Sequence, residues 1–256
     1  MTNAARKLPP PEEEEQLAEG TLISHLLELR SRITKALAAL IVVFVCLAPF
    51  STRIFELVSA PLRAVLPGGQ MIVTDVAAPF LTPFKTTFFV ALFMAMPVVL
   101  HQVWRFVAPG LYRKERRLAV PLLASSIVLF YAGMAFAYFV VFPIMFKFFV
   151  GSTPAGVEML TDISAYLDFV LTLFLAFGIA FETPIVTMAL IWSGVCSRTT
   201  LAGARPYVFL GTFVVGMLLA PDVSSMTLMA IPMYLLYEAG LIFARFLFAE
   251  KIAAKA

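Results

Sequence analysis

Charge is scarce in this sequence. Asp, Glu, Lys and Arg together make up 14% of its 256 residues, whereas ordinary soluble domains contain about 25%. Cysteine and histidine are scarcer still, with two residues of each. Cys46 and Cys196 lie in different segments, and neither histidine has an acidic or cysteine partner at ligand spacing, so we expect no disulfide framework, no metal site and no cofactor. Gly-x-Ser-x-Gly and His-Glu-x-x-His motifs are also missing, which argues against an enzyme.

Apolar residues dominate instead, at 61% of the chain. Six apolar runs are candidate membrane spans, and they cover about residues 33–50, 84–104, 118–146, 169–192, 207–220 and 226–244. We therefore expect an all-α polytopic membrane protein with a single six-span domain at residues 21–246. A disordered cytoplasmic tail at 1–20 would precede it, and a second cytoplasmic tail at 247–256 would follow it.

The predicted spans differ in length. Run 118–146 is longer than one perpendicular crossing needs, so its helix should tilt or protrude. Run 207–220 reaches only about 21 Å, against a hydrocarbon core of about 30 Å. A tight turn at 221–225 joins it to the sixth run, and we expect helices five and six both to be short. The resulting molecule should have a concave face, with Glu182 as a candidate for its floor, and segment 51–83 should form a cap of short helices.

The basic residues predict the orientation. With six spans, both termini lie on the same side of the membrane. Fifteen Lys and Arg residues belong to the tails and to the second and fourth loops, whereas the opposite face holds four. Because loops rich in Lys and Arg stay in the cytoplasm, both termini should be cytoplasmic.

Glu182 is the only charged residue in run 169–192. An acidic side chain near the bilayer centre costs about 2.5–3.5 kcal/mol, so it normally faces protein or water and has a function. Pro184 cannot donate a backbone hydrogen bond and leaves the carbonyl of Ala180 without its helical partner. This polar, kinked point is either a working site or a structural acid that is hydrogen-bonded between helices.

Two more acidic residues stand among basic ones at the predicted cytoplasmic surface. Glu28 belongs to an amphipathic helix at 21–32 that we expect to lie in the headgroup zone and to lead into the first span. Glu115 lies in loop 104–117 together with five Lys and Arg residues, which could contact anionic lipid. Either carboxylate could receive a guanidinium group from a partner. The alternatives are an ion pair between Glu28 and Arg32, and a solvated Glu115 that pairs with its neighbours.

Several ordered motifs resemble the TatC family of the twin-arginine protein translocase. The resemblance runs from about Thr21 to Phe246 and is carried by seven stretches: His25–Arg32, Thr74–Phe80, Gln102–Tyr112, Glu115–Arg117, Phe136–Pro143, Phe177–Pro184 and Arg205–Tyr207. It implies a receptor and core subunit that binds signal peptides carrying paired arginines. With TatA- and TatB-type single-span proteins, such a subunit exports folded proteins across the bacterial inner membrane, driven by the protonmotive force.

The resemblance also implies roles for individual residues and for assembly. The signal-peptide site would comprise Glu28, Glu115, Phe106, Pro109 and Arg30, and Glu182 matches the buried acid of the family. Partner binding falls on Met217 and Leu218, and assembly or transport on Pro61, Phe80, Tyr138 and Asp222. The subunit would work in the lipid bilayer as part of a homo-oligomeric receptor complex, with no nucleic-acid partner.

Two positions depart from the family pattern. A single proline precedes Asp222 where the family usually has two, and Met226 stands where a polar residue is common. The main rival hypothesis is a proton-coupled small-molecule transporter with Glu182 as the relay. Such transporters often contain internal repeats, and this sequence shows none.

Overall fold

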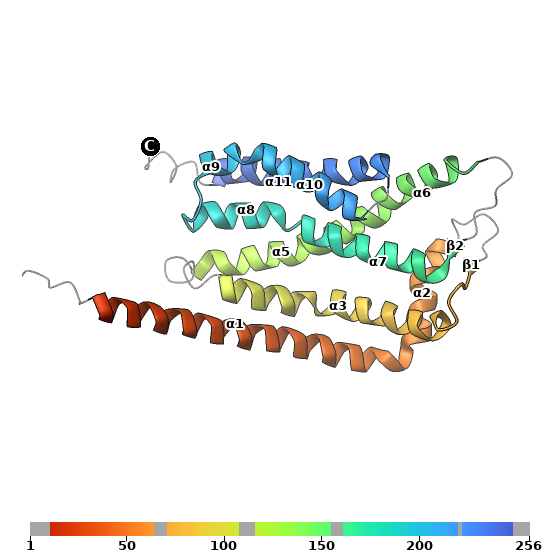
Figure 1. Cartoon of the computed structure of the whole chain (residues 1–256), viewed down its shortest axis with the longest axis horizontal. Coiled ribbons are helices and arrows are strands. Elements are labelled where there is room, and N and C mark those ends of the chain that lie inside the picture. Colours follow the sequence, from red (N-terminus) through yellow and green to blue (C-terminus); the bar gives the residue numbers. More distant parts are fainter. Residues whose placement is uncertain (1–10, 64–70, 108–115, 155–160, 220–221, 248–256) are drawn as a thin grey trace, which may run out of the picture.

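The protein is a bundle of long helices. The computed structural model describes residues 11–63, 71–107, 116–154, 161–219 and 222–247. The main helices are α1 (Pro11–Leu47), α2 (Ser51–Arg63), α3 (Ala78–Val107), α5 (Arg116–Phe136), α6 (Phe142–Gly151), α7 (Ile163–Ala180), α8 (Thr183–Trp192), α9 (Arg198–Gly203), α10 (Arg205–Leu219) and α11 (Val223–Leu247). Most of them run along one axis, with α1 at one edge of the bundle and α10 and α11 at the other (Figure 1).

Five helical stretches in the described part are long and apolar enough to cross a membrane: Ile23–Ala60, Ala78–Phe106, Val120–Gly151, Ile163–Trp192 and Val223–Phe246. The sixth apolar helix, α10, has 15 residues and a length of about 22 Å. The expectation of a short fifth helix is confirmed. That of a short sixth helix is wrong, because α11 has 25 residues. Asp222 accepts a hydrogen bond of 2.8 Å from the Ser225 N–H and so starts this helix three residues earlier than the apolar run suggests.

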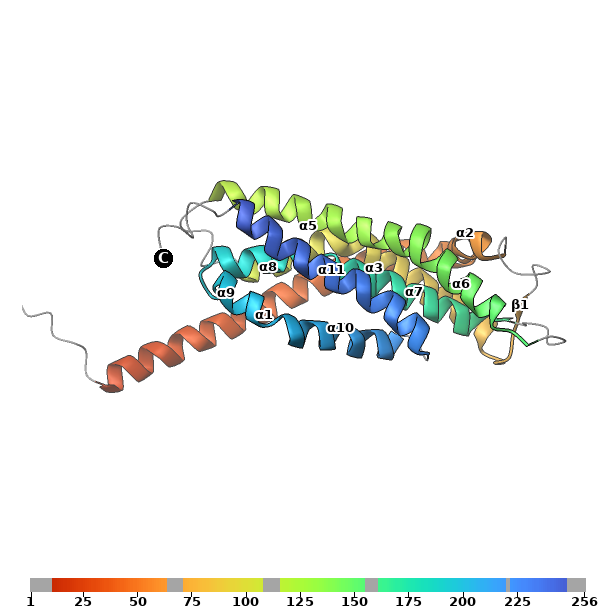
Figure 2. The same cartoon turned by 90° about the horizontal axis from the view of Figure 1, so that it is seen from above.

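The N-terminal part differs from the expectation as well. Helix α1 begins at Pro11 and continues without a break to Leu47. Residues 11–20 are therefore helical where we expected a disordered tail. Segment 21–32 leads into the first span, as expected, and does so along one axis (Figure 2). Its position in the headgroup zone stays a prediction. Proline suits the first position of a helix, and the Glu, Gln, Leu and Ala residues that follow favour helix. Residues 1–10 lie outside the described residues.

The third span bends where its helix changes type. A π-helical turn, η2 (Ala137–Val141), joins α5 to α6, and the Phe142 N–H bonds to the Ala137 carbonyl. Pro143 follows directly and has no N–H of its own, so a π-bulge here accommodates it. Helix α6 then leans away from the line of α5 (Figure 1). This bend is how the long third run is accommodated.

The far end of the bundle, away from the start of α1, is closed by α2 and by two outer segments. Helix α2 turns across this end after the 3₁₀ turn η1 (Ala48–Phe50), as expected for a helical cap (Figure 1). The strands β1 (Met71–Ile72) and β2 (Thr161–Asp162) pair in parallel beside it, which the sequence did not suggest. Asp162 joins the two segments, because one carboxylate oxygen accepts from the N–H and hydroxyl of Thr74. Its other oxygen caps the start of α7.

Close packing of α5 on α7 forms the centre of the bundle. Phe130 and Phe177 are fully buried there, and glycines let the two backbones approach. A Cβ built on Gly133 would lie 2.4 Å from the Phe177 carbonyl oxygen, and one on Gly178 would lie 2.6 Å from the Phe130 ring. A side chain at either position would push the helices apart.

Replacing Gly133 by alanine should therefore destabilise the protein. The new methyl group meets backbone, which cannot rotate away, so we expect a loss of about 1–3 kcal/mol and a lower Tm in a thermal unfolding scan in detergent. The matched control is Gly211→Ala, because nothing lies within 4 Å of that position and alanine favours helix by up to about 1 kcal/mol. Equal Tm values for the two variants would contradict this packing.

The Asp162 link should show a pH dependence. Hydrogen bonds from the Ala165 N–H, from the hydroxyl and N–H of Thr74 and from the Ser164 N–H lower the pKa of Asp162 to about 2. Because the folded pKa lies below the ordinary value of about 3.9, the stabilisation is complete above that value and disappears as the pH falls toward 2. Asp162→Ala should lower the Tm at pH 7, and its difference from wild type should shrink below about pH 4. Glu56→Ala, in an exposed position on α2, should leave the Tm unchanged at every pH.

Candidate functional site

Glu182 sits at a break in the fourth span. Helix α7 ends at Ala180 and α8 begins at Thr183, with a turn between them. The Glu182 N–H bonds to the Ile179 carbonyl, and the Glu182 carbonyl accepts from the Val186 N–H at 2.9 Å. Pro184 occupies the first turn of α8. The interruption expected from Pro184 is therefore confirmed, and it places a carboxyl group inside the bundle.

Three spans contribute to the surroundings of this carboxyl group. The Ser126 hydroxyl on α5 donates to Oε2 of Glu182. The Trp104 indole N–H, near the end of α3, donates to the Ser126 oxygen at 3.1 Å. Oε1 of Glu182 is buried and has no hydrogen-bond partner in the part of the chain that the structure describes. Glu182 is thus hydrogen-bonded between helices, as the structural alternative predicted, yet one oxygen can still take a further hydrogen bond.

Trp104 and Ser126 were not predicted from the sequence to lie beside Glu182. The available signals were weak: Trp104 marks the end of an apolar run, and Ser126 is a small polar residue inside another. Their contact with Glu182 depends on how three helices pack, which residue spacing along the chain does not reveal.

A second polar group lies where α1 passes the end of α3. Arg32 donates to Oε1 of Glu28 at 2.9 Å and to the Gln102 side chain at 3.4 Å. Beside them the His25 and Phe106 rings stack, with centroids 4.4 Å apart. The ion pair between Glu28 and Arg32, one of the two alternatives for Glu28, is thus present. The Glu28 side chain is 35% exposed, so a ligand can reach it.

The structure describes only some of the other residues predicted to bind the signal peptide. Pro109 and Glu115 lie outside the described residues. Arg30 is exposed on α1, and its carbonyl accepts from the Thr34 hydroxyl. Phe106 stacks on His25, which lies on the same helix as Glu28, and the pairing of Glu28 with Glu115 in one site stays a prediction.

The residues predicted for partner contact and assembly lie elsewhere. Met217 and Leu218 on α10 are 62% and 78% exposed. Phe80 is exposed at the far end, where its ring lies 5.1 Å from that of Phe84. Asp222 caps α11, which gives it a structural role. Pro61 belongs to α2, and its side chain lies outside the description.

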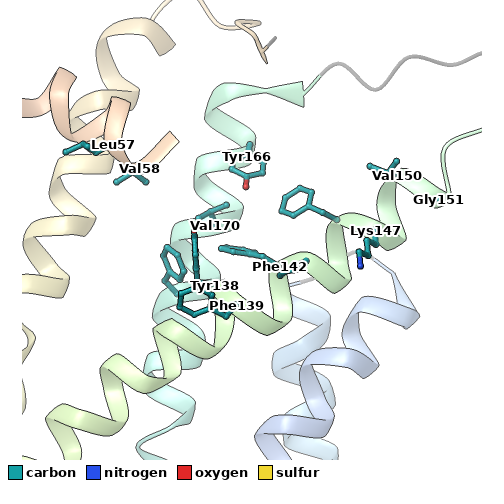
Figure 3. A pocket seen from close by; sticks show the side chains of 13 residues that line it. Leu57, Val58, Tyr138, Phe139, Phe142, Lys147, Val150, Gly151, Tyr166 and Val170 are labelled. Atoms are coloured by element: carbon teal, nitrogen blue, oxygen red, sulfur yellow. The ribbon is translucent and has the colours of Figure 1, made fainter. Parts of the chain in front are cut away.

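The structure also contains an apolar cavity away from Glu182. A cavity of about 930 Å³ opens at the far end of the bundle, between η2 and α6 on one side and α7 and α2 on the other (Figure 3). Its walls include Tyr138, which was predicted for assembly or transport, whereas Glu182 does not line it. Glu182 as the floor of a concave face stays a prediction, and its carboxyl group accepts a hydrogen bond from Ser126 within the bundle.

Comparison of the sequence with known proteins identifies the family of this chain. The family model described as "Sec-independent protein translocase protein (TatC)" matches residues 24–232. The chain belongs to the TatC family. A TatC from Azotobacter chroococcum mcd 1 is 61% identical over 236 residues, which cover 91% of this chain and 92% of that relative. The TatC of Escherichia coli strain K12 is 57% identical over 227 residues, covering 88% of each chain.

A solved structure gives the same result. The crystal structure of a twin-arginine translocase receptor, TatC, superimposes with a TM-score of 0.79 at 39% identity, covering 87% of this chain and 98% of that one. Membership of the TatC family and the apolar helices make this chain a multi-pass membrane component of protein transport. The family supports the translocase hypothesis over the small-molecule transporter.

The Glu182 site yields a stability prediction. Ser126→Ala removes the hydroxyl that joins Trp104 to Glu182 and leaves the indole N–H and a carboxyl oxygen without partners. Unpaired buried polar groups cost about 1–3 kcal/mol, so the Tm in detergent should fall. Ser125→Ala is the neighbouring control, and an equal fall in both variants would show that the hydroxyl of Ser126 contributes nothing specific.

Proposed function

We propose that this protein is the receptor subunit of a twin-arginine translocation system. It binds the signal peptides of folded proteins and, with TatA- and TatB-type single-span partners, exports those proteins across the bacterial inner membrane using the protonmotive force. The observation that carries the proposal is the group around Glu28. There an accessible carboxylate already binds one guanidinium group, that of Arg32 at 2.9 Å, beside an aromatic stack.

The chemistry of the group suits an arginine ligand. A guanidinium group is planar and can bind a carboxylate through two parallel hydrogen bonds, which the point charge of lysine cannot reproduce. Arg32 is itself held by Gln102, so the Glu28–Arg32 pair is tied to α3. A second arginine would bind Glu115, in the segment that follows α3. The basic residues around Glu115 would repel ligands whose charges miss the two acidic residues.

The proposal includes an orientation in the membrane. The bias of Lys and Arg toward the tails and the second and fourth loops puts both termini in the cytoplasm. The Glu28 group is then cytoplasmic, and α2 and the β1–β2 pair face the opposite side. With α10 the chain crosses six times, and a helix of about 22 Å requires a locally thinner bilayer or shielding by other protein.

Two further surfaces fit the assembly of a translocase. The exposed Met217 and Leu218 on α10 offer an apolar face to the single helix of a TatA- or TatB-type partner. Oε1 of Glu182, which has no hydrogen-bond partner among the described residues, could accept one hydrogen bond inside the membrane. The apolar stretch of a bound signal peptide would extend toward it. Several copies of the chain would share one receptor complex.

Removing both proposed carboxylates should abolish recognition of the paired arginines. Each bidentate, charge-assisted contact is worth about 1.5–3 kcal/mol, so Glu28→Gln and Glu115→Gln should each weaken binding about tenfold or more. The measurement is the dissociation constant of a fluorescent twin-arginine signal peptide for the full chain in lipid nanodiscs. Replacing both arginines of the peptide by lysine should weaken binding to wild type by a similar factor.

Two results bear directly on the assignment. Glu56→Gln, which removes an exposed carboxylate at the opposite end of the bundle, should bind the peptide as wild type does. Unchanged affinity in the Glu28→Gln, Glu115→Gln double variant, or equal affinity for the lysine peptide, would reject the receptor site as assigned.

A further inference from the structure

The cavity at the far end of the bundle has a lining that resembles neither the Glu28 group nor the Glu182 site. Its walls are mainly aromatic and aliphatic: Phe142, Phe146 and Phe174 line it together with Tyr138, Tyr166 and Val170. Among the lining residues, Lys147 is the single charged one. Figure 3 shows the Tyr166 hydroxyl and the Lys147 amine at separate points of this otherwise carbon-lined space.

Lys147 lies near the end of α6 and lines the cavity. It is exposed on α6, four residues before the helix ends at Gly151. A lysine near the end of a spanning helix extends its ammonium group to the interface, and tyrosines gather at the same level. Within the described residues no carboxylate forms an ion pair with Lys147, whereas Lys85, on the same half of the molecule, is held by Asp168 at 2.5 Å. Among the described residues, Lys147 is therefore a cation without a carboxylate partner, and it lines an apolar cavity.

The size of the cavity also restricts its occupant. A transmembrane helix about 10 Å wide and about 30 Å long fills more than twice the volume available, whereas about 930 Å³ is the size of a small-ligand pocket. In addition, Leu57 and Val58 of α2 line the cavity, and α2 turns across this end of the bundle (Figure 1). An acyl chain of a lipid, which ends at the membrane surface, fits this shape better than a transmembrane helix that continues beyond the surface.

We propose that the cavity binds one anionic phospholipid from the leaflet at the far end of the bundle. An acyl chain would lie among Tyr138, Phe142 and Phe174, and the net negative headgroup, in which no choline cation neutralises the phosphate, would pair with the Lys147 ammonium. The lipid would fill the space between α6 and α7 and would hold the bent α6 against α2. This inference does not depend on where signal peptides bind.

Photoactivatable lipids test the proposal directly. The full chain, purified in detergent, is labelled with phosphatidylglycerol or phosphatidylcholine that carries a diazirine in one acyl chain, and the labelled peptides are identified by mass spectrometry. We expect phosphatidylglycerol to label the η2–α6 and α7 segments. Because one lysine near an anionic group contributes about a fivefold difference, Lys147→Gln should reduce that labelling about fivefold, to the level of phosphatidylcholine.

Matched variants separate this site from general attraction of anionic lipid. Lys147→Arg should keep the labelling, and Arg53→Gln, which removes another exposed cation of the far end, should leave it unchanged. Unaltered phosphatidylcholine labelling in Lys147→Gln shows that the variant is folded. Equal phosphatidylglycerol labelling of wild type and Lys147→Gln, or labelling confined to other helices, overturns the proposal. Complete loss of labelling on adding an equimolar TatB-type single-span protein also overturns it, in favour of a helix as the occupant.

Discussion

The bilayer contains no water that could satisfy a broken backbone hydrogen bond, and this constraint shapes the molecule. Two spans nevertheless break, each just before a proline. At η2 the Phe142 N–H keeps a partner by bonding to the Ala137 carbonyl. At the end of α7 the N–H groups of Phe181 and Glu182 bond to carbonyls within the preceding turn. The chain therefore changes direction at both places without leaving those N–H groups exposed to lipid.

The broken spans are also the ones that carry distinctive chemistry. The break in the fourth span brings a carboxyl group inward, and the π-turn in the third span opens the cavity beside α6. Both breaks adjoin the tight contact between α5 and α7, where Gly133 meets the Phe177 backbone. A rigid contact beside two bends fixes the geometry of each bend. Among the described residues Oε1 of Glu182 has no hydrogen-bond partner, and an unsatisfied polar atom is costly in this setting.

Sequence reasoning recovered the features that depend on local pattern. Hydropathy located the five helices of the described part that are long and apolar enough to cross a membrane, and Pro184 marked the break beside Glu182. The short α10 also followed from its run of apolar residues. By contrast, the early start of α11 follows from a side-chain cap by Asp222, which a hydropathy pattern does not register. The β1–β2 pair and the contact of Trp104 with Ser126 join residues far apart in the chain, so only the packed structure reveals them.

The Glu28 group has an energetic consequence for the proposed receptor. A ligand arginine that binds Glu28 competes with or joins Arg32, so one guanidinium contact replaces or supplements another of the same kind. Two charge-assisted contacts of about 1.5–3 kcal/mol each fall short of the roughly 8 kcal/mol that micromolar affinity requires. The charges at this end therefore cannot supply the affinity alone. They select the ligand and set its register, and most of the binding free energy must come from burying the apolar part of the signal peptide. A receptor built in this way would reject most apolar segments by charge and would retain the correct one through the hydrophobic effect.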